Sequence, residues 1–214
     1  RQLIHHLAEQ NISGIQFPDV ADNWLKSRIK SCCNTHNIKI TETVSPNFLN
    51  TLDGVKPFFD KKKTYFQTAF YIEQRKQRNI LLDAGGHPLG GQWTFDADNR
   101  LKYPKNDKPP LVTAAKEDCY GQEAKAYVAK HFPNNYGSAE NFIYPTDHAG
   151  ASLWLDEFLE TRFEKFGRYE DAMVANEHYL HHSVLTPMLN IGLLSPQQII
   201  DRALLVADKK NIPL

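Results

Sequence analysis

The chain has 214 residues, and its 25 basic and 25 acidic side chains give a formal net charge of zero. Hydrophobic residues make up 41% and charged residues 23% of the sequence, which is typical of a globular protein and excludes a disordered chain or a coiled coil. The balanced charge gives no global positive field toward nucleic acid or a membrane surface, although a local basic patch stays open.

Targeting and cysteine patterns narrow the cellular setting. No apolar run approaches the ~18 residues of a membrane span and no signal-peptide pattern opens the chain, so we expect a cytoplasmic protein without membrane contact. Cys32, Cys33 and Cys119 show no CxxC spacing, so we expect reduced thiols and assign no metal ligand. The chain begins without Met, which indicates a piece of a longer protein.

The first part of the chain predicts alternating helices and strands. Residues 1–11 and 19–36 have helical patterns, and residues 13–17 and 38–44 are strand candidates. A strand, a helix and a strand in about 30 residues predict a βαβ unit with parallel strands. The apolar residues that carry these patterns are Leu3, Ile4, Leu7, Val20, Trp24, Ile29, Ile38, Ile40 and Val44, with Asp19 as a helix cap.

Two further helices are expected before residue 80. Ser45-Pro46 is typical of a helix start, and residues 57–78 form one long helical pattern. The polar side of the long pattern is basic and is formed by Lys61, Lys62, Lys63, Arg75, Lys76 and Arg78. This side is either a solvated surface or one that faces a polyanion.

From residue 82 the composition changes. Residues 82–110 are rich in Gly, Pro, Asn and Asp and predict an irregular connector, in which the paired glycines form turns rather than a phosphate loop. Residues 117–132 predict a helix that ends before Pro133, and Thr146 or Asp147 caps the next helix. The predicted fold class is therefore α/β in the front half, followed by an all-helical back half.

Two helix starts follow in close succession near the end of the chain. Thr186-Pro187 and Ser195-Pro196 each place a hydroxyl at the N-cap and a proline at the first helical position. A helix N-terminus is also an anion site, and His182, Ser183 and Thr186 supply donors suited to a diphosphate. The residues alone leave two interpretations open, two capped structural helices or a phosphate site.

The histidines ahead of the first helix start allow a third interpretation. His178, His181 and His182 have the i, i+3 and i+4 spacing of metal ligands on a helix, and Asp171 and Glu177 are close in sequence. No HExxH motif fixes such a site, so a metal-binding hydrolase is kept as a distant alternative.

The segment HSVLTPMLNIGLLSPQQ, residues 182–198, resembles the flavin-binding segment of the photolyase and cryptochrome superfamily, whose common form is TSxLSPYLxxGxLSPR. It departs from that form at Val184, Met188 and Gln197, where Arg, Tyr and Arg are frequent. Together with GGQWTFDADNR and FGRYEDAMVANE, the segment is similar to the deoxyribodipyrimidine photolyase-related proteins, the bacterial iron-sulfur branch.

This resemblance implies a domain organisation and a cofactor site. Residues 1–81 are expected to be part of a Rossmann-like α/β antenna domain, residues 82–141 a connector with a helix, and residues 142–214 the start of an all-helical FAD-binding domain. The residues implied to line the FAD diphosphate are His182, Ser183, Val184, Leu185 and Thr186, with Asn190 as a weaker candidate. For the full-length protein the resemblance also implies an iron-sulfur cluster and a lumazine-like antenna pigment.

The function implied is light-dependent repair of (6-4) or other pyrimidine photoproducts in damaged DNA by electron transfer from reduced FAD. A cryptochrome-type blue-light photoreceptor without repair activity is the alternative within the superfamily. Candidate contacts to DNA phosphate, or simply residues of a solvated loop, are Asn99, Arg100, Lys102 and Lys105. We expect the 214-residue fragment to bind flavin weakly or not at all and to lack repair activity. Its exposed helices after Phe142 are then either unsupported or packed against another copy.

Overall fold

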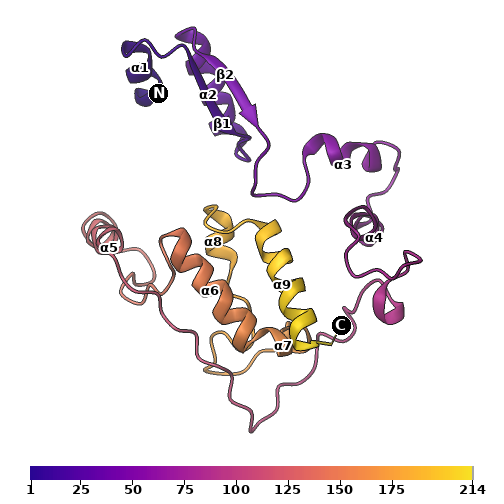
Figure 1. Cartoon of the computed structure of the whole chain (residues 1–214). Helices are drawn as coiled ribbons and strands as arrows, with labels where there is room; N and C mark the ends of the chain where they lie inside the picture. The colour runs from indigo at the N-terminus through magenta and orange to yellow at the C-terminus, as the bar shows by residue number, and fades with distance from the viewer. Residues whose placement is uncertain (214) are drawn as a thin grey trace. The chain divides into compact units, whose positions relative to one another are not determined.

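The structure, a computed structural model, describes residues 1–213. The chain forms two compact units, one made of Arg1–Pro57 and the other of the residues from Phe58 onward (Figure 1). Helices and a small parallel sheet of two strands make up the regular structure of these residues, which agrees with the α/β class. The predicted boundaries at residues 81 and 141 stay a prediction. No helix within residues 1–213 is both long and apolar enough to cross a membrane.

The first unit contains the predicted βαβ arrangement. Helix α1 (Gln2–Glu9) precedes strand β1 (Gly14–Pro18), helix α2 (Asn23–Thr35) and strand β2 (Lys39–Thr43). The two strands are parallel, with Gly14 opposite Lys39 and Pro18 opposite Thr43. The core of the unit is small: Ile4, Cys33 and Ile38 are buried, and the partly buried side chains around them are Leu7, Ala8, Ile15, Ile29, Cys32 and Ile40.

The predicted cap of α2 was wrong by three residues. The carboxylate of Asp22, not that of Asp19, accepts the Leu25 amide at 2.6 Å, because the helix begins at Asn23. Asp19 instead pairs with Lys26. The predicted core contact Trp24 was also wrong, because its side chain is 81% exposed. Leu3 and Val44, which carry the helical and strand patterns, are 67% and 70% exposed.

The helix predicted at Ser45-Pro46 was wrong, and of the helix predicted over residues 57–78 only the part from Gln67 to Arg78 is confirmed as one continuous helix. Helix α3 (Leu52–Phe59) begins later, where the hydroxyl of Thr51 accepts the Gly54 amide at 3.0 Å. The long pattern is broken, because α4 (Gln67–Arg78) starts after an extended Phe66. In one continuous helix Phe59 and Phe70 would be about 16 Å apart along the axis. Their ring centroids instead lie 4.9 Å apart, so aromatic packing folds the segment back.

The second unit carries the larger core. Its elements after α4 are the 3-10 turn η1 (Leu89–Gly91), α5 (Cys119–His131), α6 (His148–Thr161), α7 (Phe163–Phe166), the 3-10 turn η2 (Gly167–Tyr169), α8 (Thr186–Asn190) and α9 (Pro196–Lys210). The predicted irregular connector and the helices over α5 and α6 are confirmed, with Asp118 and Asp147 as caps. Helices α6, α8 and α9 pack side by side (Figure 1). Their buried core consists of Ala151, Trp154, Leu155, Phe158, Leu159, Leu185, Met188 and Leu194.

Candidate functional site

The predicted site residues His182 to Thr186 form a loop, here called loop 182–186, that enters α8. Leu185 is buried in the core against α6, and Thr186 and Asn190 are exposed. The amide of His182 donates to Tyr179 O at 2.8 Å, and the amide of Leu189 donates to Leu185 O at 3.1 Å. The structure therefore brings the five consecutive candidates together, whereas Asn190 lies at the far end of α8.

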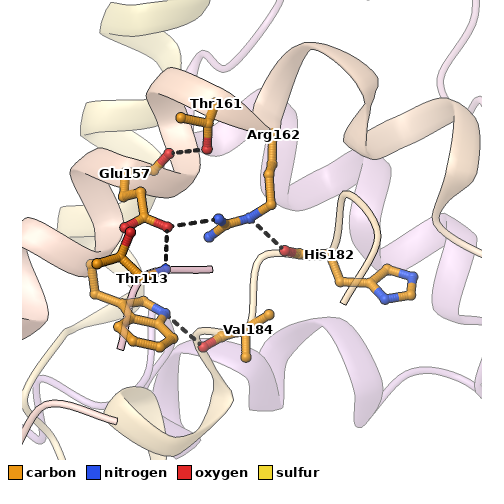
Figure 2. A network of polar contacts seen from close by, with 7 residues as sticks. Thr113, Glu157, Thr161, Arg162, His182 and Val184 are labelled. Carbon is orange, nitrogen blue, oxygen red and sulfur yellow. Dashed lines mark hydrogen bonds and ion pairs between the residues drawn. The ribbon is translucent and has the colours of Figure 1, made fainter. Parts of the chain in front are cut away.

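Two side chains of the α6 segment bind carbonyl groups of this loop. Arg162, which directly follows α6, donates from Nε to His182 O at 3.2 Å, and Trp154 donates from Nε1 to Val184 O at 3.1 Å. Figure 2 shows the contact of Arg162 with the carbonyl of His182. The loop is thus attached to α6 through its backbone at two positions that flank Ser183.

Arg162 belongs to a network of polar contacts inside the second unit. Its side chain is fully buried, and its Nη1 donates to Glu157 Oε1 at 3.0 Å. The same carboxylate oxygen accepts the amide of Thr113 at 3.1 Å (Figure 2). Burial raises the pKa of Glu157, but the hydrogen bonds from Thr113 and Arg162 outweigh it, and the net effect is a lowered pKa. Glu157 therefore remains the anionic partner that a buried guanidinium requires.

The backbone of loop 182–186 changes from a left-handed to a right-handed helical conformation. Val184 has a left-handed φ of 54°, and Leu185 follows in the right-handed helical region with φ −95° and ψ −12°. Within residues 1–213 no acceptor is found for the amides of Ser183, Val184, Leu185 and Thr186. Successive amides in such a left-handed and right-handed sequence form nests for anions. The loop can thus offer several N–H groups to one negatively charged ligand.

The two predicted helix caps differ. Ser195 is confirmed as the N-cap of α9, where its hydroxyl and the side chain of Gln198 form a capping box. The predicted cap at Thr186 was wrong, because α8 already begins at Thr186 and no side chain caps it. The N-cap position falls on Leu185, and Pro187 is at the second position. Helix α8 is only five residues long, so any anion would be bound by the loop amides rather than by a helix terminus.

The helix required by the metal-ligand interpretation is not formed, since residues 174–185 lie in turns and loops. His181 is buried, and its Nε2 lies 3.2 Å from the hydroxyl of Tyr103. Burial lowers the pKa of His181, and the charge of Lys165 adds to this effect. The ring of His182 instead contacts Glu170 O at 2.9 Å. Among the described residues no three His, Cys, Asp or Glu side chains are grouped so that they could hold a metal ion.

The segments GGQWTFDADNR and FGRYEDAMVANE, which the sequence analysis compared with the photolyase-related proteins, pair with each other. The amide of Leu101 donates to Arg168 O, and the amide of Asp171 donates to Asn99 O, both at 3.2 Å. The side chains of Asn99 and Arg100 contact Glu170 and Asp171 at 2.8 and 3.1 Å. These two candidates for DNA contact are therefore engaged within the protein. No ion pair within residues 1–213 involves the other two, Lys102 and Lys105.

The polar groups that bind loop 182–186 were not predicted from the sequence. Arg162 follows Phe158 by four residues and Leu159 by three, so it lies on the apolar side of the helical pattern. A charged residue on that side is the signal that could have identified it, because a buried charge needs a partner. Trp154 was visible only as an apolar residue, since nothing in the sequence predicts the acceptor of its indole N–H.

Comparisons with known proteins were made for the whole chain. Residues 1–144 match the model of a family described as deoxyribodipyrimidine photo-lyase-related protein. A (6-4) photolyase of Agrobacterium fabrum is 27% identical over 179 residues, which are 84% of this chain and 35% of that protein. Two uncharacterized proteins of Acanthamoeba polyphaga mimivirus are 36% and 41% identical over 90 and 46 residues, 40% and 22% of this chain. The chain spans between 35% and 45% of the length of these relatives.

Proposed function

Because the chain belongs to the deoxyribodipyrimidine photo-lyase-related protein family, we propose that it is part of a light-dependent DNA repair flavoprotein. The similarity to a (6-4) photolyase over 84% of the chain supports (6-4) pyrimidine photoproducts as the lesion. The partner is then damaged DNA, whose altered bases cost least to move out of the stack.

The observation that carries the proposal is the run of amides in loop 182–186 without an acceptor in the described part of the chain. Four N–H groups in a turn of this shape fit the diphosphate of FAD, which presents several anionic oxygens. Loop 182–186 is also the segment that resembles the flavin-binding segment of photolyases. The resemblance of this segment and its backbone geometry therefore support the same residues.

In this proposal the loop binds and orients the cofactor mainly through its backbone. The amides of Ser183, Val184, Leu185 and Thr186 bind the diphosphate, and the ring of His182, fixed by Glu170 O, borders it. Asn190 is a weaker candidate because it is exposed at the end of α8. When bound and reduced, FAD supplies the light-driven electron for repair, and the protein positions and insulates it.

The further cofactors implied by the family resemblance are proposed only for the whole protein. An iron-sulfur cluster and a lumazine-like antenna pigment are to be sought in the longest chain that the gene encodes. For residues 1–214 alone we propose weak or no flavin binding and no repair activity.

The test uses the longest chain that the gene encodes. Its visible spectrum is recorded first, and FAD and riboflavin are then titrated into the apoprotein. We expect a flavin band and FAD affinity more than about tenfold above that of riboflavin, because charge-assisted hydrogen bonds to the diphosphate are lost in riboflavin. Equal affinity for the two flavins, or no binding of either, would overturn the cofactor site.

The repair step is tested separately with an oligonucleotide that carries one (6-4) photoproduct. Blue light should restore the undamaged sequence in the presence of the reduced protein, and the dark reaction is the control. A flavin-containing protein that leaves the lesion unchanged would instead be a photoreceptor, and the repair proposal would be wrong.

A further inference from the structure

We propose that Arg162 and Trp154 are positioning residues for the cofactor loop, although neither belongs to the flavin-binding segment. This inference rests on the proposed function of loop 182–186. Arg162 binds the carbonyl of His182 and Trp154 binds the carbonyl of Val184. The two donors therefore determine how the peptide groups of the loop are oriented.

The physical link is the planar trans peptide group. In each such group the C=O and the N–H point in opposite directions. The carbonyl of His182 shares its peptide group with the amide of Ser183, and the carbonyl of Val184 shares its group with the amide of Leu185. When Arg162 and Trp154 draw these two carbonyls toward α6, they direct the two amides away from α6. Both amides belong to the run that lacks an acceptor in residues 1–213.

The cost of burying Arg162 indicates a role beyond packing. Its side chain has no exposed surface, and moving an ion from water to the interior costs several kcal/mol unless it is well paired. Only Nη1 and Nε are used, for Glu157 and His182, and Nη2 has no partner within the described residues. An apolar side chain at position 162 would fill the core without the cost of burying a charge.

Arg75 is a second buried arginine in the same unit, and it contacts only residues close to it in sequence. It is 5% exposed, and its three nitrogen groups bind the carbonyls of Ile80, Leu81 and Trp93. All of these contacts lie within residues 75–93. Arg75 is therefore a matched control for Arg162, since both are buried cations that bind backbone carbonyls.

Trp154 forms the second hydrogen bond to the loop, and its donor is an uncharged indole N–H. Its ring lies in the core with Leu155 and Phe158, a place that phenylalanine could also fill. Only the indole N–H reaches Val184 O. Trp154→Phe thus removes one donor and keeps most of the apolar contact.

The test measures the loop in the 214-residue chain by nuclear magnetic resonance. The chain has three tryptophans, so its indole N–H signals are few, and Trp154→Phe identifies the signal of Trp154 by its loss. Three exchange rates report on the loop: those of the Trp154 indole, of the His182 amide and of the Leu189 amide. The amides are bonded to Tyr179 O and Leu185 O on either side of the loop.

In Arg162→Lys we expect the Trp154 indole and the two amides to exchange about tenfold faster, because lysine is a point donor that cannot bind Glu157 and His182 as the guanidinium does. In Trp154→Phe we expect the same change at the two amides. The amides of α9 should keep their rates. Arg75→Lys should change the connector around residues 80–93 and leave all three reporters unchanged.

Two results would overturn the inference. One is unchanged reporter rates in both loop variants. The other is a uniform rise across the second unit in Arg162→Lys that Arg75→Lys reproduces, which would show a general loss of stability. If Arg162→Lys does not fold, Trp154→Phe alone decides through the two amides.

A second measurement separates this inference from the proposed function. In the longest encoded chain, both loop variants should lower FAD affinity about tenfold, while the affinity for riboflavin, which lacks phosphate, changes less than about twofold. Arg75→Lys should bind FAD as the unsubstituted protein does. Absence of FAD binding in the unsubstituted protein would contradict the proposed function, and equal losses for both flavins in the variants would contradict the positioning role.

Discussion

His181 is a buried imidazole that directly precedes loop 182–186 and contacts Tyr103 of the connector. Its ring lies beside the contacting rings of Tyr103 and Tyr169, with centroids 5.8 and 5.9 Å away. Its Nδ1 has no hydrogen-bond partner in the described part of the chain. Burial is the largest cause of the lowered pKa of His181; the charge of Lys165 lowers the pKa further and that of Asp107 raises it. His181 therefore stays neutral in the folded protein over a wider pH range than in the unfolded chain.

The lowered pKa of His181 has a direct consequence for stability. As the pH falls below the ordinary value of 6.5, the unfolded chain binds a proton that the folded chain does not. The free energy of unfolding should therefore decrease from pH 7 toward pH 5. In His181→Gln, which keeps an acceptor for Tyr103 but does not titrate, this decrease should be smaller. Urea unfolding of both proteins at several pH values measures the difference, and parallel pH profiles would contradict the prediction.

At the scale of elements, the two hydroxyls that precede the last two helices should differ in their effect. Ser195→Ala should cost about 1 kcal/mol of unfolding free energy, because it removes the capping box of α9. Thr186→Ala should stay within about 0.5 kcal/mol, because the Thr186 hydroxyl caps nothing and is exposed. Urea unfolding followed through the Trp154 indole signal measures both in the second unit. Equal losses in the two variants would show that Thr186 also caps its helix.

The sequence could predict those elements whose signals are local. The βαβ unit follows from apolar periodicity, and the caps at Asp147 and Ser195 lie next to clear helical patterns. The break between α3 and α4 could not be predicted, because it depends on rings that meet only in space, such as Phe59 and Phe70.

The candidate site was predictable only in part, for the same reason. Loop 182–186 was proposed from its resemblance to a known segment, and its role as a cofactor site stays a prediction. Its supports are distant in sequence: Trp154 is 30 residues from Val184, and Thr113 is 44 residues from Glu157. Pairing of Asn99 with Glu170 across 71 residues likewise leaves no local pattern.

At the scale of the whole molecule, the second unit contains a helix with little burial. Helix α5 has no buried residue within its bounds. Apolar and aromatic side chains remain on its surface, with Tyr120, Tyr127, Val128 and Phe132 exposed by 72%, 56%, 40% and 47%. Soluble monomers rarely leave large contiguous apolar patches uncovered. We expect self-association of the 214-residue chain through this surface of α5, whereas the sequence placed it on the helices after Phe142.

The association is tested by sedimentation velocity over a range of protein concentrations. The chain should show a rising mean sedimentation coefficient, because contact between copies removes apolar surface of α5 from water at about 25 cal/mol per Å². Combined Tyr127→Lys and Val128→Lys substitution should shift the chain toward monomer without loss of helix signal, since both side chains are already exposed. Leu153→Lys on α6 is the control, because Leu153 is 69% exposed and lies outside the α5 surface. A chain that stays monomeric at high concentration, or a control that dissociates copies as well as the α5 variant does, would show that α5 does not mediate association.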